Sequence, residues 1–169
     1  ALHEGTSFPV GKVDFLRLCP MNFDEFLRAN DKDQLADMLM AGDEELINVF
    51  GSTCQELLKS YYVVGGMPEA VLSYITEHDY RKVQTIQKNI LSAYEHDFSK
   101  HAPKDIVPKI SLVWHSIPSQ LARENNRFLY GAVREGGSAR EVETAIEWLN
   151  DCGLIYKLYR TTHPALPLK

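Results

Sequence analysis

The chain is 169 residues long, with 44% hydrophobic and 24% charged residues and a net charge of −5, a composition typical of a globular protein with one domain or two small ones. Residues 1–100 carry 9 Lys/Arg against 16 Asp/Glu and residues 101–169 carry 9 against 7, so even the second part lacks the concentrated basic surface that phosphate binding favours. No apolar run approaches the roughly 20 residues that span a bilayer and no signal peptide opens the chain, so we expect a cytoplasmic location.

The first predicted element is a strand. Residues 13–18 (VDFLRL) are short and mostly apolar, and Pro20 follows them, a pattern that favours a strand. No second strand is predicted nearby. We therefore expect this strand to pair with a sheet outside the chain.

Residues 22–64 show helical periodicity, interrupted by residues that can cap helix ends. Asn22 with Glu25, and Thr53 with Glu56, match the capping box, in which two side chains satisfy free backbone N–H groups at a helix start. Short polar connections between these helices predict a small bundle. The predicted helix starts are Asn22, Asp33, Asp43 and Thr53, and the predicted stops are Gly42 and Gly51.

Gly65–Pro68 breaks the helical pattern, and its proline suits the first turn of a new helix, where the missing N–H is not needed. Asp79 can cap the next and longest helix. The proline-containing segment 102–108 indicates a linker. A helix over residues 110–124 follows, and Pro118 is expected to divide it.

The clearest pattern lies near the C-terminal end, where a capped helix, a glycine stop and a strand follow one another. Ser138 and Glu141 match a capping box, and apolar residues recur at helical spacing behind them. Gly153 suits a left-handed C-terminal cap, and Leu154–Arg160 is rich in branched and aromatic residues. With a short strand at Phe128–Tyr130, this predicts a winged helix. The apolar residues are Val142, Ala145, Ile146 and Leu149.

Two patterns that could indicate catalysis are incomplete. Gly11-Lys12 resembles the end of a phosphate-binding loop, but Gly5 lies one position too far away and Val13 replaces the hydroxyl residue. The histidines lack metal-ligand spacing or the partners of a nucleophile, so a hydrolase is the least favoured function and solvated or partly buried histidines are expected. They are His96, His101 and His115.

The three cysteines, Cys19, Cys54 and Cys152, are odd in number and far apart. This spacing fits neither a disulfide framework nor a metal site. We expect reduced thiols in the core.

A nucleic-acid function is also considered, because the second helix of helix-turn-helix folds enters the major groove. The basic residues expected to contact phosphates are Arg123, Arg127, Arg134, Arg140 and Lys157. The last helix, however, is mainly acidic on its polar side and would repel phosphates. We therefore favour packing of this module against another protein domain and keep nucleic-acid binding as the alternative.

Three segments resemble prokaryotic AAA-type P-loop ATPases with a C-terminal domain of unknown function, related to the archaeal-type ATPases of the STAND group. Residues 11–27 (GKVDFLRLCPMNFDEFL) are similar to the block that follows the sensor strand of the ATPase core. Residues 65–71 (GGMPEAV) resemble the G-x-P motif of the helical lid. The third segment is the winged-helix pattern, with residues 117–121 and 145–159.

The resemblance implies part of a larger ATPase, because the phosphate-binding loop and the Mg²⁺-binding acidic strand of that family precede this block. Residues 1–21 would be a remnant of the ATPase core, residues 22–102 a helical lid and residues 103–169 a winged-helix domain. The expected fold is therefore mainly α, a helical lid-type bundle followed by a winged helix with a small β-hairpin.

By the same resemblance, Gly66 and Pro68 would contact the nucleotide, since glycine allows close approach and proline offers an apolar ring to the base. The residue types also fit a tight interhelical turn, and both interpretations can hold. Lys12 stands where the family often has arginine, which puts a charge-sensing role there in doubt.

The expected function is regulatory: the chain would couple the nucleotide state of an ATPase to a partner domain without being catalytic alone. It would hold no cofactor itself, and ATP and Mg²⁺ would bind the intact ATPase. The expected partners are the P-loop core and a following C-terminal domain, with nucleic acid under the alternative and no membrane.

Overall fold

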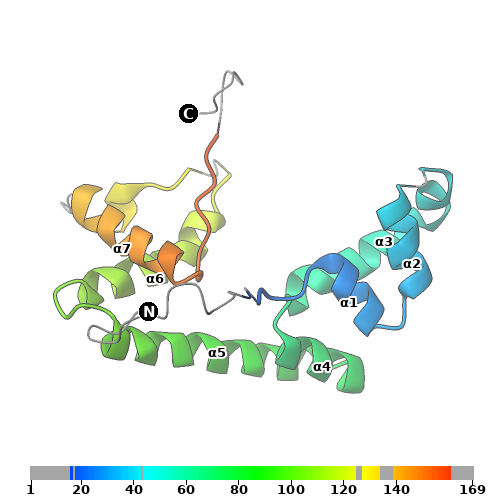
Figure 1. Ribbon diagram of the computed structural model, residues 1–169, viewed down its shortest axis with the longest axis horizontal. Coiled ribbons are helices and arrows are strands. Elements are labelled where there is room, and N and C mark those ends of the chain that lie inside the picture. Colours follow the sequence, from blue (N-terminus) through cyan, green and yellow to red (C-terminus); the bar gives the residue numbers. More distant parts are fainter. Residues whose placement is uncertain (1–15, 17, 43, 125–126, 134–138, 161–169) are drawn as a thin grey trace, which may run out of the picture. The chain divides into compact units, whose positions relative to one another are not determined.

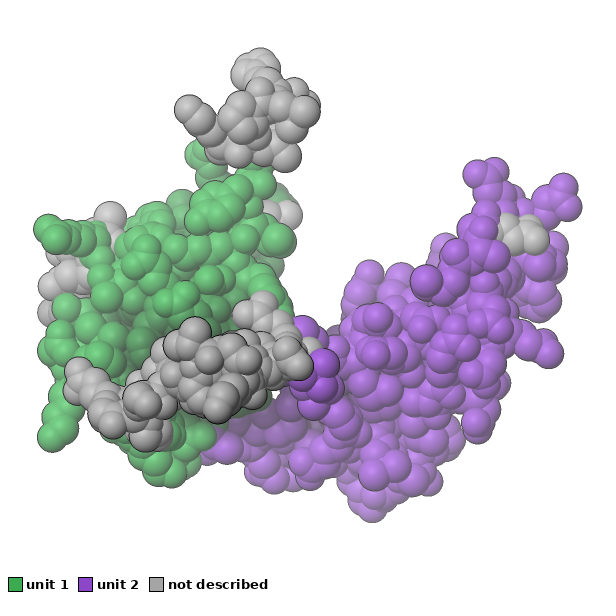
Figure 2. All heavy atoms as spheres, in the orientation of Figure 1, with its two compact units in different colours: residues 1–6, 94–169 green, residues 7–93 purple. Residues whose placement is uncertain are grey.

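The computed structural model describes residues 16, 18–42, 44–124, 127–133 and 139–160, and Figure 1 labels its helices. The chain divides into two compact units, shown in different colours in Figure 2. The described residues up to 93 form the N-terminal unit, and those from 94 onward form the C-terminal unit. None of the described helices is long and apolar enough to cross a bilayer.

The N-terminal unit is a small helical bundle around an apolar core. Its elements are α1 (Phe23–Ala29), α2 (Asp33–Ala41), α3 (Glu44–Val64), α4 (Pro68–Glu77) and the first part of α5 (Tyr80–His101). Its core residues are Phe26, Val64, Ala70, Val71 and Val83.

Several predicted helix ends of this unit are confirmed. Asn22 and Glu25 form the capping box, with bonds of 2.9 Å from the Glu25 N–H to Asn22 Oδ1 and 2.8 Å from the Asn22 N–H to Glu25 Oε2. Pro68 lies in the first turn of α4, and Gly42 ends α2 in the left-handed conformation. The N-cap position of α2 is occupied by Lys32, whose side chain makes no capping bond. Asp33 is therefore the first helical residue and not the cap.

The predicted break at Gly51 is wrong, because α3 runs unbroken for 21 residues through it. Thr53 and Glu56 consequently lie inside a helix and do not cap one. A single glycine costs a helix only about 1 kcal/mol relative to alanine. The C-terminal end of α3 is fixed from α5, where Gln87 Nε2 donates to the Val63 and Val64 carbonyl oxygens, both at 2.9 Å.

The C-terminal unit has a separate core, formed mainly between α6 (Val107–Leu121) and α7 (Ala139–Asp151) with the end of α5. α6 and α7 contact each other (Figure 1). α6 continues through Pro118 and is not divided there. A short 3-10 helix, η1 (Tyr130–Ala132), lies before α7. The core residues are Phe98, Ala102, Ile106, Ile110, Val113, Val142, Ala145, Ile146 and Leu149.

The predicted apolar face of α7 is confirmed, and so is its glycine stop. Gly153 has φ +72°, its N–H donates to the Asn150 carbonyl oxygen, and the Leu154 N–H donates to that of Leu149, the bond pattern of a left-handed helix stop. The predicted capping box of Ser138 and Glu141 involves groups that lie outside the described part of the structure.

The predicted winged helix with a β-hairpin is wrong. None of the described residues forms a strand, including Leu154–Arg160 and Phe128–Tyr130, while residues 13–15 and Arg17 lie outside the described part. A strand needs a partner for its backbone groups, and the described residues offer none to Leu154–Arg160. Instead, Ile155 packs on the core and Lys157 bonds to Glu143 of α7.

The cysteines are free, but the expectation of core thiols is wrong. Cys19 and Cys152 are exposed and Cys54 is half-buried. Neighbouring atoms nevertheless shield the Cys152 thiol from part of the solvent, and this desolvation raises its pKa, which favours the unreactive protonated form.

The continuity of α3 gives a direct test. A Cβ added at Gly51 would meet nothing within 4 Å, so Gly51→Ala should gain helix propensity at no steric cost. We expect the free energy of unfolding to rise by about 0.5–1 kcal/mol, measured by urea denaturation followed by circular dichroism. A loss of stability would show that α3 is interrupted there.

Candidate functional site

The candidate site lies where the segment entering α1 meets the turn between α3 and α4. The Met21 N–H donates to the Gly66 carbonyl oxygen at 2.7 Å. A Cβ built on Gly66 would lie 2.1 Å from the Met21 carbonyl oxygen and 2.9 Å from its nitrogen. No real side chain tolerates such contacts, so only glycine allows this approach. We call this contact between Met21 and Gly66 the clasp.

Tyr61 of α3 adds a second hydrogen bond to Met21. Its hydroxyl donates to the Met21 carbonyl oxygen at 2.8 Å, so both backbone polar groups of Met21 are bonded to the α3–α4 region. The centroid of the Tyr61 ring also lies 5.6 Å from the ring centroid of Phe23 and 5.3 Å from that of Phe26. These distances are typical of favourable aromatic pairs. Backbone bonds and ring packing therefore hold the start of α1 in one position.

The turn itself is built for this contact. Gly65 has φ +73°, a conformation that favours glycine, and its N–H donates to the Tyr61 carbonyl oxygen at 2.7 Å. Pro68 then begins α4, with its ring exposed. Of the two residues predicted to contact a nucleotide, Gly66 thus makes its close approach to Met21, and Pro68 faces solvent.

The clasp joins two of the segments that show the ATPase resemblance. Met21 belongs to residues 11–27 and Gly66 to residues 65–71, which are far apart in the sequence. Residue patterns indicate both segments but neither their contact nor the role of Tyr61. The glycine pair followed by proline was the available signal, since a second glycine beside a turn glycine indicates close backbone approach.

The predicted phosphate-contacting residues are spread over several elements. Arg123 and Arg127 follow α6 and are exposed, Arg140 is exposed on α7, and Arg134 lies outside the described residues. Lys157 is half-buried and paired with Glu143. It is therefore engaged within its own unit and does not face solvent as a free cation.

Glu143 is a structural centre that the sequence analysis missed. Its carboxylate accepts from Lys157 Nζ at 2.5 Å and from the Tyr130 hydroxyl at 2.6 Å. These bonds, the one to Lys157 first, lower the pKa of Glu143, and the Glu143 carboxylate in turn raises the pKa of Lys157 and of Tyr130. One side chain of α7 thus fixes both η1 and the segment after Gly153.

The described histidines form no catalytic arrangement with their neighbours. His115 Nδ1 lies 2.7 Å from the Ser111 carbonyl oxygen and its Nε2 lies 3.5 Å from Glu95. Ser116 is buried and donates to the Val113 carbonyl oxygen, as a helical serine with a structural role does. Within the part of the chain that the structure describes, no group of three or more His, Cys, Asp or Glu side chains could hold a metal ion.

The clasp predicts a specific cost for Gly66→Ala. The new Cβ would collide with backbone atoms of Met21, which cannot move aside as a flexible side chain could. We expect a loss of about 2–3 kcal/mol in the free energy of unfolding, measured by urea denaturation. Gly51→Ala is the matched control, since the same change there should stabilise. If both substitutions stabilise, Met21 is not held against Gly66.

The Glu143 contacts predict an acid-sensitive segment. Because the folded pKa of Glu143 is lowered, these contacts are complete above the ordinary carboxyl pKa of about 4.3 and are lost as the pH falls through the lower folded value. Glu143→Gln should loosen residues 155–160 at neutral pH, seen as lower ¹⁵N heteronuclear NOE values. Asp151→Asn, an exposed change on the same helix, is the control. Equal NOE values in both variants and in the unaltered protein would contradict this role.

The chain belongs to the family described as Domain of unknown function (DUF8612), whose model matches residues 55–169. The match begins within α3 and includes Gly66, whereas Met21 lies before it. Comparisons with curated proteins and with solved structures gave no match.

Proposed function

We propose that this member of the DUF8612 family is a regulatory helical part of a prokaryotic AAA-type P-loop ATPase, not catalytic by itself. The N-terminal unit would be the lid that responds to nucleotide, and the C-terminal unit would relay that response to a following domain. ATP and Mg²⁺ would be held by a P-loop core.

The clasp is the observation that supports this proposal. In the ATPases that the chain resembles, the segment before Met21 is continuous with the core, and the turn at Gly66 belongs to the lid. Two hydrogen bonds to Met21 and a backbone contact too close for any Cβ connect that segment to the turn. A displacement of the entering segment would therefore move the turn with it, since packed interiors transmit strain.

The chemistry of the turn fits a lid that supplies contacts and no catalytic group. Pro68 is exposed, at the start of a helix whose N-terminal end has no side-chain cap. Its ring could pack on a nucleotide base once a core brings that base to the turn. Neither Gly66 nor Pro68 carries an ionisable group, so hydrolysis would depend on residues of the core.

The nucleic-acid alternative loses its structural basis. It rested on a winged helix that the described residues do not form, and Lys157 is paired with Glu143. The exposed surface of α7 includes Glu147 and Asp151 beside Arg140. We do not extend the proposal to nucleic acid.

Nucleotide binding tests the proposal in two steps. The chain alone should show no submicromolar binding of ATP·Mg²⁺ or ADP by isothermal titration calorimetry, whereas the complete gene product should hydrolyse ATP. In that product Pro68→Ala removes apolar surface worth about 1.6 kcal/mol, so the KM for ATP should rise about tenfold.

Pro108→Ala is the matched control, because Pro108 is also exposed in the first turn of a helix, α6. It should leave the KM unchanged. Submicromolar ATP binding by the chain alone, or a complete gene product without ATPase activity, would refute the proposal.

A further inference from the structure

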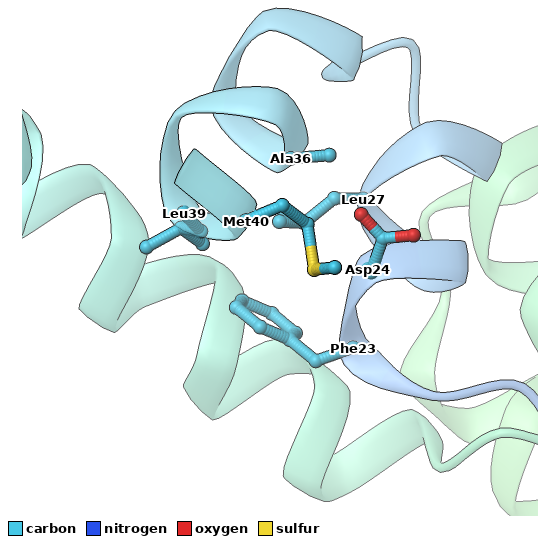
Figure 3. A pocket seen from close by; sticks show the side chains of 6 residues that line it. All are labelled: Phe23, Asp24, Leu27, Ala36, Leu39 and Met40. Atoms are coloured by element: carbon cyan, nitrogen blue, oxygen red, sulfur yellow. The ribbon is translucent and has the colours of Figure 1, made fainter. Parts of the chain in front are cut away.

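A small apolar pocket lies between α1 and α2 (Figure 3). Its floor is formed by Leu27 and Ala36, both fully buried, and Phe23 and Leu39 form half-buried walls. Met40 lies over the hollow with 73% of its surface exposed. The pocket is open to solvent on one side and has a volume of about 170 Å³; for comparison, an engineered apolar cavity of about 150 Å³ holds one benzene molecule.

The size and the apolar lining of the pocket fit one apolar side chain. A drug-sized ligand needs a pocket of about 300 Å³ or more, so this one suits a single ring or a branched aliphatic group. Methionine is flexible and polarisable, and it adapts to different apolar partners. An exposed methionine above a buried apolar floor is therefore suited to admit and cover such a group.

The surroundings of the pocket are acidic. Asp24 lines it, and Asp33 and Asp37 of α2 are 66% and 70% exposed. Arg28 is shared among these three carboxylates at 3.2, 3.5 and 2.7 Å, so these four residues together carry a net charge of −2. A complementary partner would place basic groups beside its apolar anchor, since opposite potentials favour association.

We propose that the pocket between α1 and α2 is a docking site for a cationic peptide segment, which inserts one phenylalanine- or leucine-sized side chain flanked by Lys or Arg. The anchor fills the hollow under Met40, and the flanking cations pair with Asp33 and Asp37. This inference does not rest on nucleotide binding, because none of Met21, Gly66 and Pro68 lines the pocket.

The test uses two peptides with the same anchor and opposite charge, Ac-Arg-Phe-Arg-NH₂ and Ac-Glu-Phe-Glu-NH₂, titrated into the ¹⁵N-labelled chain. The cationic peptide should bind with a Kd of about 1 mM, because a single anchor supplies little binding energy. Its amide shifts should be confined to α1 and α2 and should weaken as salt is added. The anionic peptide should cause none.

Met40→Lys should abolish these shifts, because it puts a charge over the hollow. Val49→Lys of α3 is the control, since Val49 is 71% exposed, close to the 73% of Met40, and lies outside the pocket; it should preserve the shifts. Both sites are exposed, so neither change should unfold the protein. Absent shifts, equal shifts with both peptides, or shifts that survive Met40→Lys would overturn the proposal.

Discussion

The N-terminal unit depends on an approach of two backbone segments that leaves no space for a side chain. Met21 and Gly66 are separated by 45 positions, yet the Gly66 Cα presents its bare side to the Met21 carbonyl group. Hydrogen bonds from Met21 to Gly66 and from Tyr61 to Met21 fix the distance. The entry to α1, the end of α3 and the start of α4 are thereby set together, and the aromatic cluster around Phe26 packs on this frame.

In the C-terminal unit, a charged side chain holds together segments that are distant in the sequence. The segment after Gly153 has the composition of a strand but no partner strand among the described residues, and Lys157 fixes it to Glu143 of α7. Tyr130 binds the same carboxylate, so η1 and this segment meet at one side chain. An ion pair that keeps part of its surface in water contributes little to stability. The role of Glu143 is therefore positional, and the core around Leu149 supplies most of the stability.

Local signals could be predicted from the sequence, and contacts between distant segments could not. The Asn22–Glu25 capping box, the left-handed Gly42 and Gly153 and the first-turn Pro68 each depend on a few neighbouring residues, and the structure confirms them. The helix stop predicted at Gly51 is wrong because a helix tolerates a single glycine. The strand predicted at Leu154–Arg160 is wrong because strand propensity alone does not form a strand without a neighbouring strand to pair with. The clasp and the role of Glu143 require knowledge of which segments meet, which residue patterns do not contain.

The central claim is that Met21 is held by the turn at Gly66, and amide hydrogen exchange at Met21 tests it most directly. Met21 lies outside every helix, so without the clasp its N–H would exchange as rapidly as in an unstructured peptide. The bond to Gly66 predicts protection comparable to that of core amides such as Val71, since exchange would need the unit to open. Exchange of Met21 at the unprotected rate, while Val71 remains protected, would contradict the account.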